Sequence, residues 1–172
     1  MAELLKSKAP NDETAQRITD AARALLDVIS QHSAEQRDDG APSPSTDKCD
    51  VLYIEDDRRT FGSVKLLLEV QRELKVLQAA NGETGVALAQ CCSPKLILLD
   101  LDLPDIHGSE VIQRLQKETS TSHIPVIVVS GDATPSQIER LLILGARNYL
   151  TKPIRVQPFL AVIDEVLPPK VH

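Results

Sequence analysis

Between residues 50 and 167, short apolar runs alternate with longer amphipathic stretches. Five runs of four to six residues are strand-like: 51–55, 76–79, 96–100, 125–130 and 148–152. The stretches that follow them have helical character: 59–74, 83–91, 109–119, 135–144 and 156–166. Strands that alternate with helices predict a parallel sheet covered on both faces. The first, third and fourth runs are almost wholly apolar, as is typical of parallel strands buried on both sides.

A different pattern precedes this region, and it predicts an amphipathic helical extension over residues 1–36. Apolar side chains recur there at spacings of four, three and four: Ile18, Ala22, Leu25 and Ile29. Residues 37–48 are rich in Gly, Pro, Ser and charge, which predicts a flexible linker. An α/β domain over 49–167 and a tail over 168–172 complete the expected organisation. Because a lone helix cannot bury its apolar stripe, we expect it to dock on the α/β domain or to pair with a second copy.

Composition and charge narrow the classes of partner. The chain has 172 residues, a net charge of −6 and 2% aromatic residues. Base stacking needs aromatic side chains and phosphate-backbone binding needs basic patches, so we expect no nucleic-acid partner. No apolar run approaches the roughly 20 residues that cross a bilayer, and no signal peptide is evident, so we expect a cytoplasmic location and no membrane partner. Three cysteines, Cys49, Cys91 and Cys92, fit buried, reduced thiols.

Four of the five strand-like runs end in charged or hydroxyl side chains. The first run ends in Glu55 and is followed by Asp56, the third ends in Asp100, the fourth in Ser130 and the fifth in Lys152. The carboxyl ends of the strands in an open parallel sheet meet at the edge where ligands bind. Three carboxylates gathered there repel one another, and Mg²⁺, which takes oxygen ligands, relieves that repulsion. A hydroxyl and an ammonium group suit a phosphoryl group, and a carboxylate can attack phosphorus to form an acyl phosphate.

Taken together, these motifs closely resemble the receiver domain of two-component response regulators. The matching segments are VLYIEDD at 51–57, LILLDLDLPDIHG at 96–108, VIVVSG at 126–131 and NYLTKP at 148–153. The resemblance covers residues 49–167 and implies the flavodoxin-like (βα)5 fold, with parallel strands in the order 2-1-3-4-5. It also implies a phosphoacceptor without separate enzymatic turnover, and a histidine kinase or histidine phosphotransfer protein as phosphodonor. Two architectures stay open: a stand-alone receiver with a helical extension, or a receiver of the type found in hybrid sensor histidine kinases.

The resemblance also implies roles for the acidic residues. Asp100 takes the phosphoryl group from a partner phosphohistidine. Asp56 and Asp100 ligate Mg²⁺ directly, together with the backbone carbonyl of Asp102, whereas Glu55 acts through a metal-bound water. Mn²⁺ is an expected substitute.

The remaining implied roles belong to phosphate binding and switching. Ser130 and neighbouring backbone N–H groups hold a phosphoryl oxygen, and Lys152 pairs with the phosphate. Movement of Ser130 and an inward turn of Tyr149 alter the face formed by residues 135–144, 148–152 and 156–166, which binds a downstream partner or a second copy. The Lys152–Pro153 bond is usually cis in the family.

Four further positions are singled out by their place in these motifs. Asp102 and Asp132 lie two residues after the acceptor and after Ser130, where they either tune the lifetime of the phosphate or are simply solvated. Asp57 is expected to cap the helix that follows it. Gly108 is expected to provide a tight turn before the next helix.

Two other functions compete with the receiver. The Asp100-Leu-Asp102 sequence resembles the nucleophile motif of haloacid-dehalogenase-like phosphatases, with Asp100 as nucleophile and Asp102 as general acid. That family carries its motif on the first strand, whereas here the Glu55-Asp56 pair lies on an earlier strand. A non-phosphorylated interaction module would lack an acceptor, an acid pair or a lysine, and none of these is missing.

Overall fold

The computed structural model describes residues 48–132 and 134–169. The predicted helical extension over 1–36 lies outside the described residues. So do residues 37–47 of the predicted linker and residues 170–172 of the tail. The predictions for these segments therefore stay predictions.

One sheet of five parallel strands forms the centre of the described region. Its strand order is β2-β1-β3-β4-β5, as the sequence predicts. The strands are β1 (Val51–Ile54), β2 (Val76–Ala79), β3 (Leu96–Leu99), β4 (Val126–Ser130) and β5 (Asn148–Thr151). The helices are α2 (Arg58–Arg72), α3 (Gly82–Cys92), α4 (Gly108–Lys117), α5 (Pro135–Leu144) and α6 (Val156–Val166).

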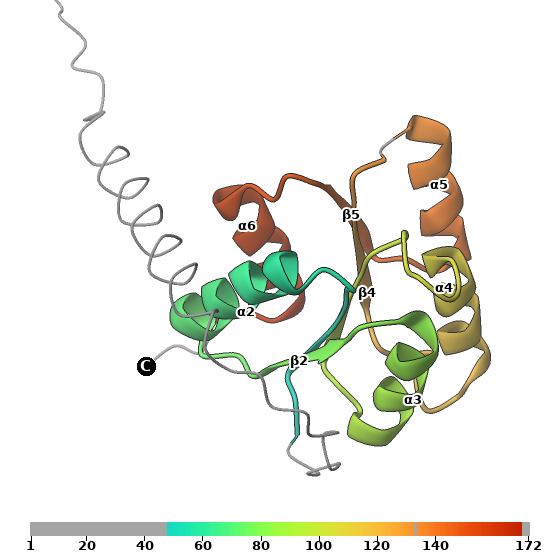
Figure 1. Ribbon diagram of the computed structural model, residues 1–172, viewed down its shortest axis with the longest axis horizontal. Coiled ribbons are helices and arrows are strands. Elements are labelled where there is room, and N and C mark those ends of the chain that lie inside the picture. The colour runs from blue at the N-terminus through green and yellow to red at the C-terminus, as the bar shows by residue number, and fades with distance from the viewer. Residues whose placement is uncertain (1–47, 133, 170–172) are drawn as a thin grey trace, which may run out of the picture. The chain divides into compact units, whose positions relative to one another are not determined.

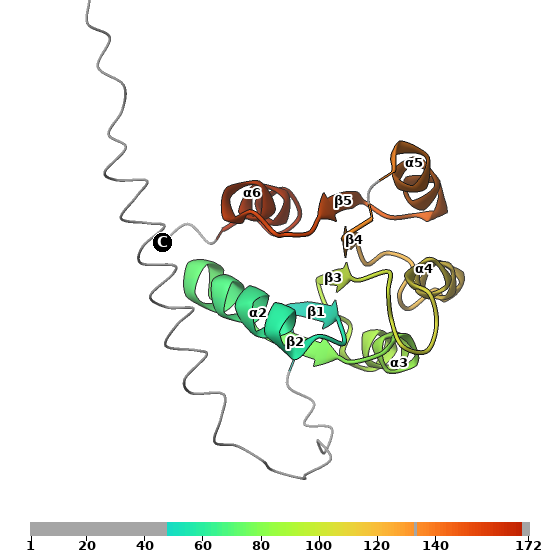
Figure 2. The same cartoon turned by 45° about the horizontal axis from the view of Figure 1, so that its top comes forward.

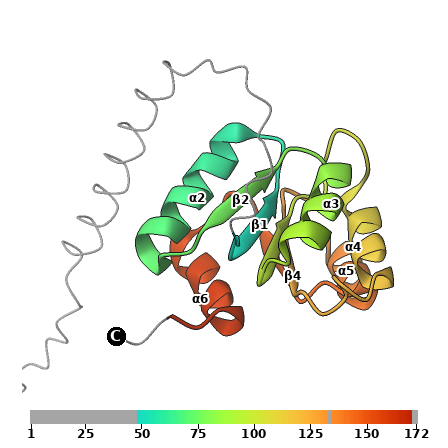
Figure 3. The same cartoon turned by 90° about the horizontal axis from the view of Figure 1, so that it is seen from below.

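The helices cover both faces of the sheet and make three layers. Helices α2 and α6 lie on one face, and α3, α4 and α5 lie on the other (Figure 1). The turned views in Figures 2 and 3 show the same division. Helices on both sides leave the central strands no solvent-facing surface, which explains why β1, β3 and β4 are buried at every position.

Alternate residues of the central strands feed two separate hydrophobic cores, because side chains alternate between the faces of a strand. Leu52 and Ile54 of β1 pack in the core under α3, α4 and α5. Val51 and Tyr53 pack in the other core, with residues of α2 and α6. The edge strands β2 and β5 are only partly buried, as expected from their position.

At their carboxyl ends, three predicted strands extend one residue beyond the observed strands, and those residues are Glu55, Asp100 and Lys152. Their backbone N–H groups still continue the hydrogen bonding of the sheet. Glu55 N donates to the carbonyl of Ala79 at 2.9 Å, Asp100 N to that of Ile54 at 3.0 Å, and Lys152 N to that of Ser130 at 2.9 Å. The sheet edge therefore fixes the backbone of the predicted site residues.

The prediction of three buried cysteines is wrong for Cys91. All three thiols are free, and Cys49 is buried, Cys92 partly buried and Cys91 exposed. The buried face of α3 carries Gly85 and Ala89. Cys91, two positions after Ala89, points away from that face, whereas Cys92, three positions after Ala89, lies on the same side as Ala89.

Candidate functional site

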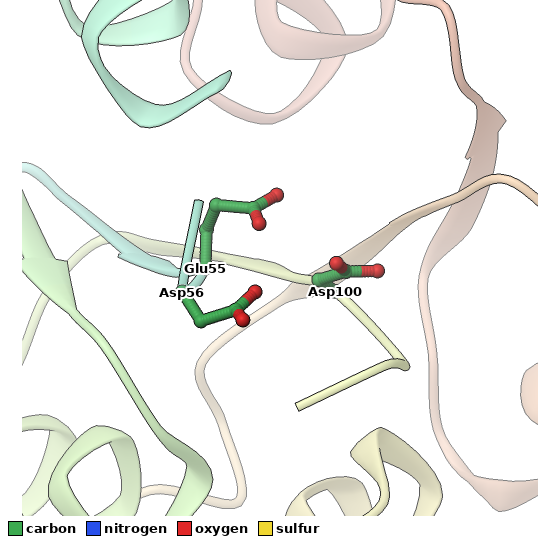
Figure 4. A group of neighbouring side chains, drawn as sticks. All are labelled: Glu55, Asp56 and Asp100. Atoms are coloured by element: carbon green, nitrogen blue, oxygen red, sulfur yellow. The ribbon is translucent and has the colours of Figure 1, made fainter. Parts of the chain in front are cut away.

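Three carboxylates gather at the carboxyl ends of β1 and β3. One oxygen from each of Glu55, Asp56 and Asp100 lies within 4.8 Å of the others. Glu55 and Asp100 are buried, whereas Asp56 is exposed. Figure 4 shows the side chains of Glu55 and Asp56 leaving the end of β1 with their carboxyl groups turned to the side of Asp100. The predicted convergence of these three residues is confirmed.

A single ammonium group joins two of these carboxylates. The Nζ atom of Lys152 lies 2.8 Å from Oε2 of Glu55 and 2.8 Å from Oδ2 of Asp100. The Lys152–Pro153 peptide bond, which follows β5, is cis, as the resemblance implies. Lys152 directly follows β5, a strand that is not adjacent to β1 or β3 in the sheet, and its side chain still reaches their carboxylates.

Burial and hydrogen bonding act in opposite directions on the charges of this site. Burial raises the pKa of Glu55 above its ordinary value, although hydrogen bonds from Lys152 and from the backbone of Asp57 counter this. Burial by itself would lower the pKa of Lys152. Its hydrogen bonds to Asp100 and Glu55 outweigh that effect, and the pKa of Lys152 is raised. The lysine therefore stays charged between its two carboxylate partners.

Asp100 is held by the chain that follows it. Its Oδ1 atom accepts a hydrogen bond from the backbone N–H of Leu101 at 2.7 Å, while Oδ2 contacts Lys152. The N–H of Asp102 lies 3.5 Å from the same Oδ1 atom. The carboxylate thus has a fixed orientation at the end of β3.

Gly108 matters to this segment through close packing rather than through the turn that we predicted. A Cβ atom at Gly108 would lie 2.7 Å from the carbonyl oxygen of Asp100 and 2.8 Å from the Cα of Leu101. Its backbone φ does not fall in the left-handed region, where among glycines only Gly145 is found in the described chain. The absence of a side chain therefore lets α4 begin directly against the Asp100 segment.

Ser130 is the last residue of β4, and Tyr149 lies on the neighbouring strand β5. Ser130 is fully buried, and its Oγ atom accepts a 3.4 Å hydrogen bond from the backbone N–H of Asp132. The hydroxyl of Tyr149 donates to the backbone carbonyl of Asp132. Burial raises the pKa of Tyr149, and the nearby charges of Asp132, Asp100 and Asp102 raise it further. Ser130 and Tyr149 therefore contact the same residue, Asp132, through their hydroxyl groups.

Asp57 does not join the acid cluster, and its expected capping role is confirmed. It is the N-cap of α2, where Oδ1 accepts from the N–H of Arg59 at 3.0 Å and Oδ2 from the hydroxyl of Thr60 at 2.8 Å. These hydrogen bonds, first that from Thr60, hold the pKa of Asp57 below its ordinary value. Asp102 and Asp132, the two predicted tuning residues, are exposed.

Two residues that the sequence analysis missed contact Glu55. The hydroxyl of Tyr53 donates to Oε2 of Glu55 at 3.1 Å, and Nε2 of Gln78 donates to the Glu55 backbone carbonyl at 2.9 Å. A signal for the first existed, because residues two apart in a strand share a face of the sheet. The second depends on the register of β1 against β2, which pairs Tyr53 with Gln78.

Comparisons with known proteins point to one family. The family model described as the response regulator receiver domain matches residues 51–164. The protein PilH of Pseudomonas aeruginosa is 34% identical over 117 residues, which cover 68% of this chain and 96% of PilH. The crystal structure of a CheY-like receiver domain protein from Methanospirillum hungatei has 30% identity and a TM-score of 0.62, over 67% of this chain and 90% of that one.

Other matches concern parts of longer proteins or the fold alone. The chain spans 48% of the transcriptional regulator RpaA of Synechocystis, at 37% identity, and 9% of histidine kinase P4 of Formosa agariphila, at 31%. The receiver domain of a sensor histidine kinase from Pseudomonas aeruginosa, which was solved with Mg²⁺ in its active-site cleft, is 21% identical with a TM-score of 0.63. It matches 69% of this chain and 97% of its own, and shows the shared fold.

The haloacid-dehalogenase alternative gains no support from these matches, and the family model that matches is that of the response regulator receiver domain. Within residues 48–132 and 134–169, no helix has the length and apolarity to cross a bilayer. The strand order 2-1-3-4-5, the acid cluster with its lysine and the matched family agree. The chain belongs to the response regulator receiver domain family and carries a receiver domain of a two-component signalling system.

Proposed function

We propose that Asp100 is the phosphoacceptor of this receiver and that Lys152 pairs with the phosphoryl group it accepts. The observation that carries the proposal is the 2.8 Å contact between Lys152 Nζ and Asp100 Oδ2, in a group of three carboxylates. A phosphoryl group on that oxygen would lie next to the positively charged ammonium group of Lys152. The pairing of a fixed carboxylate nucleophile with a neighbouring cation is the arrangement that phosphoryl transfer needs.

The donor set of the cluster fits a small, hard divalent cation. One ammonium group contacts two of the three carboxylates, so negative charge is in excess, and all the donors are oxygen atoms. Mg²⁺ suits such a set, and Mn²⁺ is an expected substitute. Asp56 and Asp100 would hold the ion directly with the carbonyl of Asp102, and Glu55 would act through a water. Bound there, the ion would neutralise charge between the carboxylate and the incoming phosphoryl oxygens.

The proposed donor is a phosphohistidine on a histidine kinase or a histidine phosphotransfer protein. An Asp100 carboxylate oxygen attacks the phosphorus and a new O–P bond forms. The P–N bond to the donor imidazole breaks, and the imidazole leaves with the electron pair of that bond and takes up a proton. Ser130 and nearby backbone N–H groups would hold a phosphoryl oxygen. The burial of Ser130 and the position of its Oγ atom next to the N–H of Asp132 support this role.

The change in charge at Asp100 would reach the surface through Ser130 and Tyr149. Both residues already contact Asp132, Tyr149 through its hydroxyl and Ser130 through Oγ. A shift of Ser130 toward the phosphate would rearrange these contacts and with them the orientation of Tyr149. Three of the four exposed large apolar side chains in the described residues lie on α5 and at the start of α6: Leu142, Ile143 and Val156. This face is the proposed docking surface for a downstream partner or a second copy.

The roles of the two remaining acids are a separate part of the proposal. Asp102 and Asp132 are exposed, and their charges act on Tyr149 beside Asp100. Carboxylates there would affect the approach of the water that hydrolyses the acyl phosphate. A dimer through the N-terminal helix and a cytoplasmic location stay predictions.

The acceptor is tested with acetyl phosphate and Mg²⁺ on wild type and on Asp100→Asn. We expect one phosphoryl group on the wild type and none on the variant, detected by intact-protein mass. Equal incorporation into both proteins would contradict the assignment of Asp100. Rapid, sustained phosphate release from many unrelated phosphate esters would instead indicate a phosphatase, and an assay of free phosphate tests this directly.

A further inference from the structure

Tyr53 brings a polar group from the hydrophobic core to the acid cluster. Its side chain is fully buried among the residues that α2 and α6 contribute to the core. Its hydroxyl nevertheless reaches Oε2 of Glu55 at 3.1 Å, and Glu55 is itself 1% exposed. The Tyr53 hydroxyl therefore donates to Glu55 from the hydrophobic core and not from the solvent-exposed side of the site.

We propose that Tyr53 is a positioning residue for the metal site, which holds the Glu55 carboxylate in the orientation that Mg²⁺ binding requires. The inference rests on the proposed function, because it takes Glu55 as part of the Mg²⁺ site. It goes beyond that function by assigning a role to a core residue that touches neither the ion nor the phosphoryl group.

A buried glutamate needs such support. Glutamate has one more rotatable bond than aspartate, so fixing its carboxylate restricts more side-chain freedom. Burial also penalises any carboxylate oxygen that lacks a donor. In this structure Oε1 accepts from the N–H of Asp57 at 3.1 Å, and Oε2 accepts from Tyr53 and Lys152. Both oxygens of Glu55 are thus held, and only Lys152 among the donors is a long, mobile side chain.

The sharing of Lys152 makes the tyrosine more important during phosphorylation. The ammonium group contacts Glu55 and Asp100 at the same distance of 2.8 Å. A phosphoryl group on Asp100 would draw Lys152 toward its own charge, and Oε2 of Glu55 would lose part of that contact. The Tyr53 hydroxyl would then remain as the donor to Oε2, so that Glu55 keeps its orientation while the lysine moves.

Packing prevents the tyrosine ring from leaving this position. The rings of Tyr53 and Phe61 have centroids 6.2 Å apart and an interplanar angle of 44°. The backbone of Tyr53 lies in β1, which is bonded on both sides to β2 and β3. A hydroxyl on a ring that cannot swing away is an effective anchor for a metal-site carboxylate.

The test is the affinity of the unphosphorylated protein for Mg²⁺, measured by calorimetry on wild type and on Tyr53→Phe. This variant removes only the hydroxyl and keeps the buried ring. Glu55 would act on the ion through a water, so Tyr53 supports a residue outside the direct ligands. Loss of such a supporting hydrogen bond weakens metal binding by roughly tenfold, and we expect a rise in Kd of about that size. The acetyl phosphate reaction should show the same shift in half-saturating Mg²⁺, with its rate largely restored at saturating Mg²⁺.

Two further variants separate positioning from packing. In a Glu55→Gln background, Tyr53→Phe should cause no additional loss of Mg²⁺ affinity, because its effect passes through the Glu55 carboxylate. Phe61→Leu, which alters the packing of the same ring, should leave the affinity within about twofold of wild type, well below the tenfold effect expected for loss of the hydroxyl.

Several outcomes would overturn the inference. They are an unchanged Kd in Tyr53→Phe, an equal loss in the Glu55→Gln background, or an equal loss in Phe61→Leu. If the wild type binds Mg²⁺ but Asp100→Asn is still phosphorylated, the proposed acceptor fails while the calorimetric result for Tyr53 stands.

Discussion

Gly108 shows how a single missing side chain lets a helix pack directly against the Asp100 segment. Its N–H donates to the carbonyl of Leu101 at 3.0 Å, and its Cα packs against the backbone of Asp100 and Leu101. The two nearest atoms are backbone atoms, which cannot rotate away from an added methyl group. Any side chain at this position would therefore push α4 away from the Asp100 segment.

We expect Gly108→Ala to lower the free energy of unfolding by about 1–3 kcal/mol, the usual range for overpacking, and to slow phosphorylation by acetyl phosphate. Urea denaturation and the acetyl phosphate reaction measure the two effects. Gly62→Ala is the matched control. Gly62 lies inside α2 with nothing within 4 Å of an added Cβ, so alanine should stabilise the protein by about 0.5–1 kcal/mol. Equal effects of the two substitutions would contradict this account.

The exposed acids at the mouth of the site support a second prediction at this scale. Asp102→Asn and Asp132→Ala each remove a negative charge near Asp100 while leaving Asp56 and Lys152 in place. We expect each variant to change the first-order decay rate of the acyl phosphate, which is followed by intact-protein mass after excess acetyl phosphate is removed. Identical decay in wild type and both variants would show that the two carboxylates are merely solvated.

At the scale of the elements, the carboxyl edge of the sheet brings together charged side chains from strands that are distant in the sequence. Sequence periodicity predicted all five strands and all five helices of the described region, with bounds that differ by at most two residues. Helix α2 ends early because Glu73 adopts a left-handed conformation with φ of 53°. Helices α2, α3 and α4 begin one residue early, directly after their caps Asp57, Asn81 and His107.

Side-chain geometry was less predictable than the elements. The convergence of Glu55, Asp56, Asp100 and Lys152 followed from parallel topology, because strand ends of one kind meet at one edge. The contacts of Tyr53 and Gln78 with Glu55 depend on strand register and on which core a side chain enters. Period-two alternation places Tyr53 on the same face as Glu55 but does not show that its hydroxyl reaches the carboxylate, and it gives no strand register that would place Gln78.

An ion pair between two helices provides a prediction on pH dependence. Arg72 at the end of α2 binds Asp164 of α6 through two hydrogen bonds, Nε to Oδ1 at 2.6 Å and Nη2 to Oδ2 at 2.7 Å. The hydrogen bonds from Arg72 hold the pKa of Asp164 below its ordinary value. A carboxylate with a lowered pKa in the folded protein stabilises it above the unfolded pKa of about 3.9, and this contribution is lost as the pH falls through the lower value.

We therefore expect Asp164→Asn to be less stable than wild type at pH 7, by about 1 kcal/mol, the upper range for a partly exposed pair. That difference should vanish as the pH is lowered through the folded-state pKa of Asp164. Urea denaturation across pH 2–7 measures it, and Glu165→Gln, an exposed neighbour on the same helix, is the control with no such pH-dependent difference. A difference that persists unchanged at the acid end would exclude the ion pair as its source.

At the scale of the whole molecule, the described region is a receiver domain with its acid cluster and Lys152 at one edge of the sheet. The curated relatives differ in length: PilH matches over 96% of its own chain, whereas RpaA continues well beyond the matched region. The matched region therefore makes up nearly all of one relative and about half of another.

The central claim is that Asp100 carries the phosphoryl group, and residue-level mapping tests it most directly. The protein is treated with acetyl phosphate and Mg²⁺, and the acyl phosphate is reduced with borohydride, which converts the phosphorylated aspartate to homoserine. The account predicts homoserine at residue 100 alone, detected by peptide mass spectrometry. Homoserine at Asp56, Asp102 or any other aspartate, with Asp100 unchanged, would contradict it.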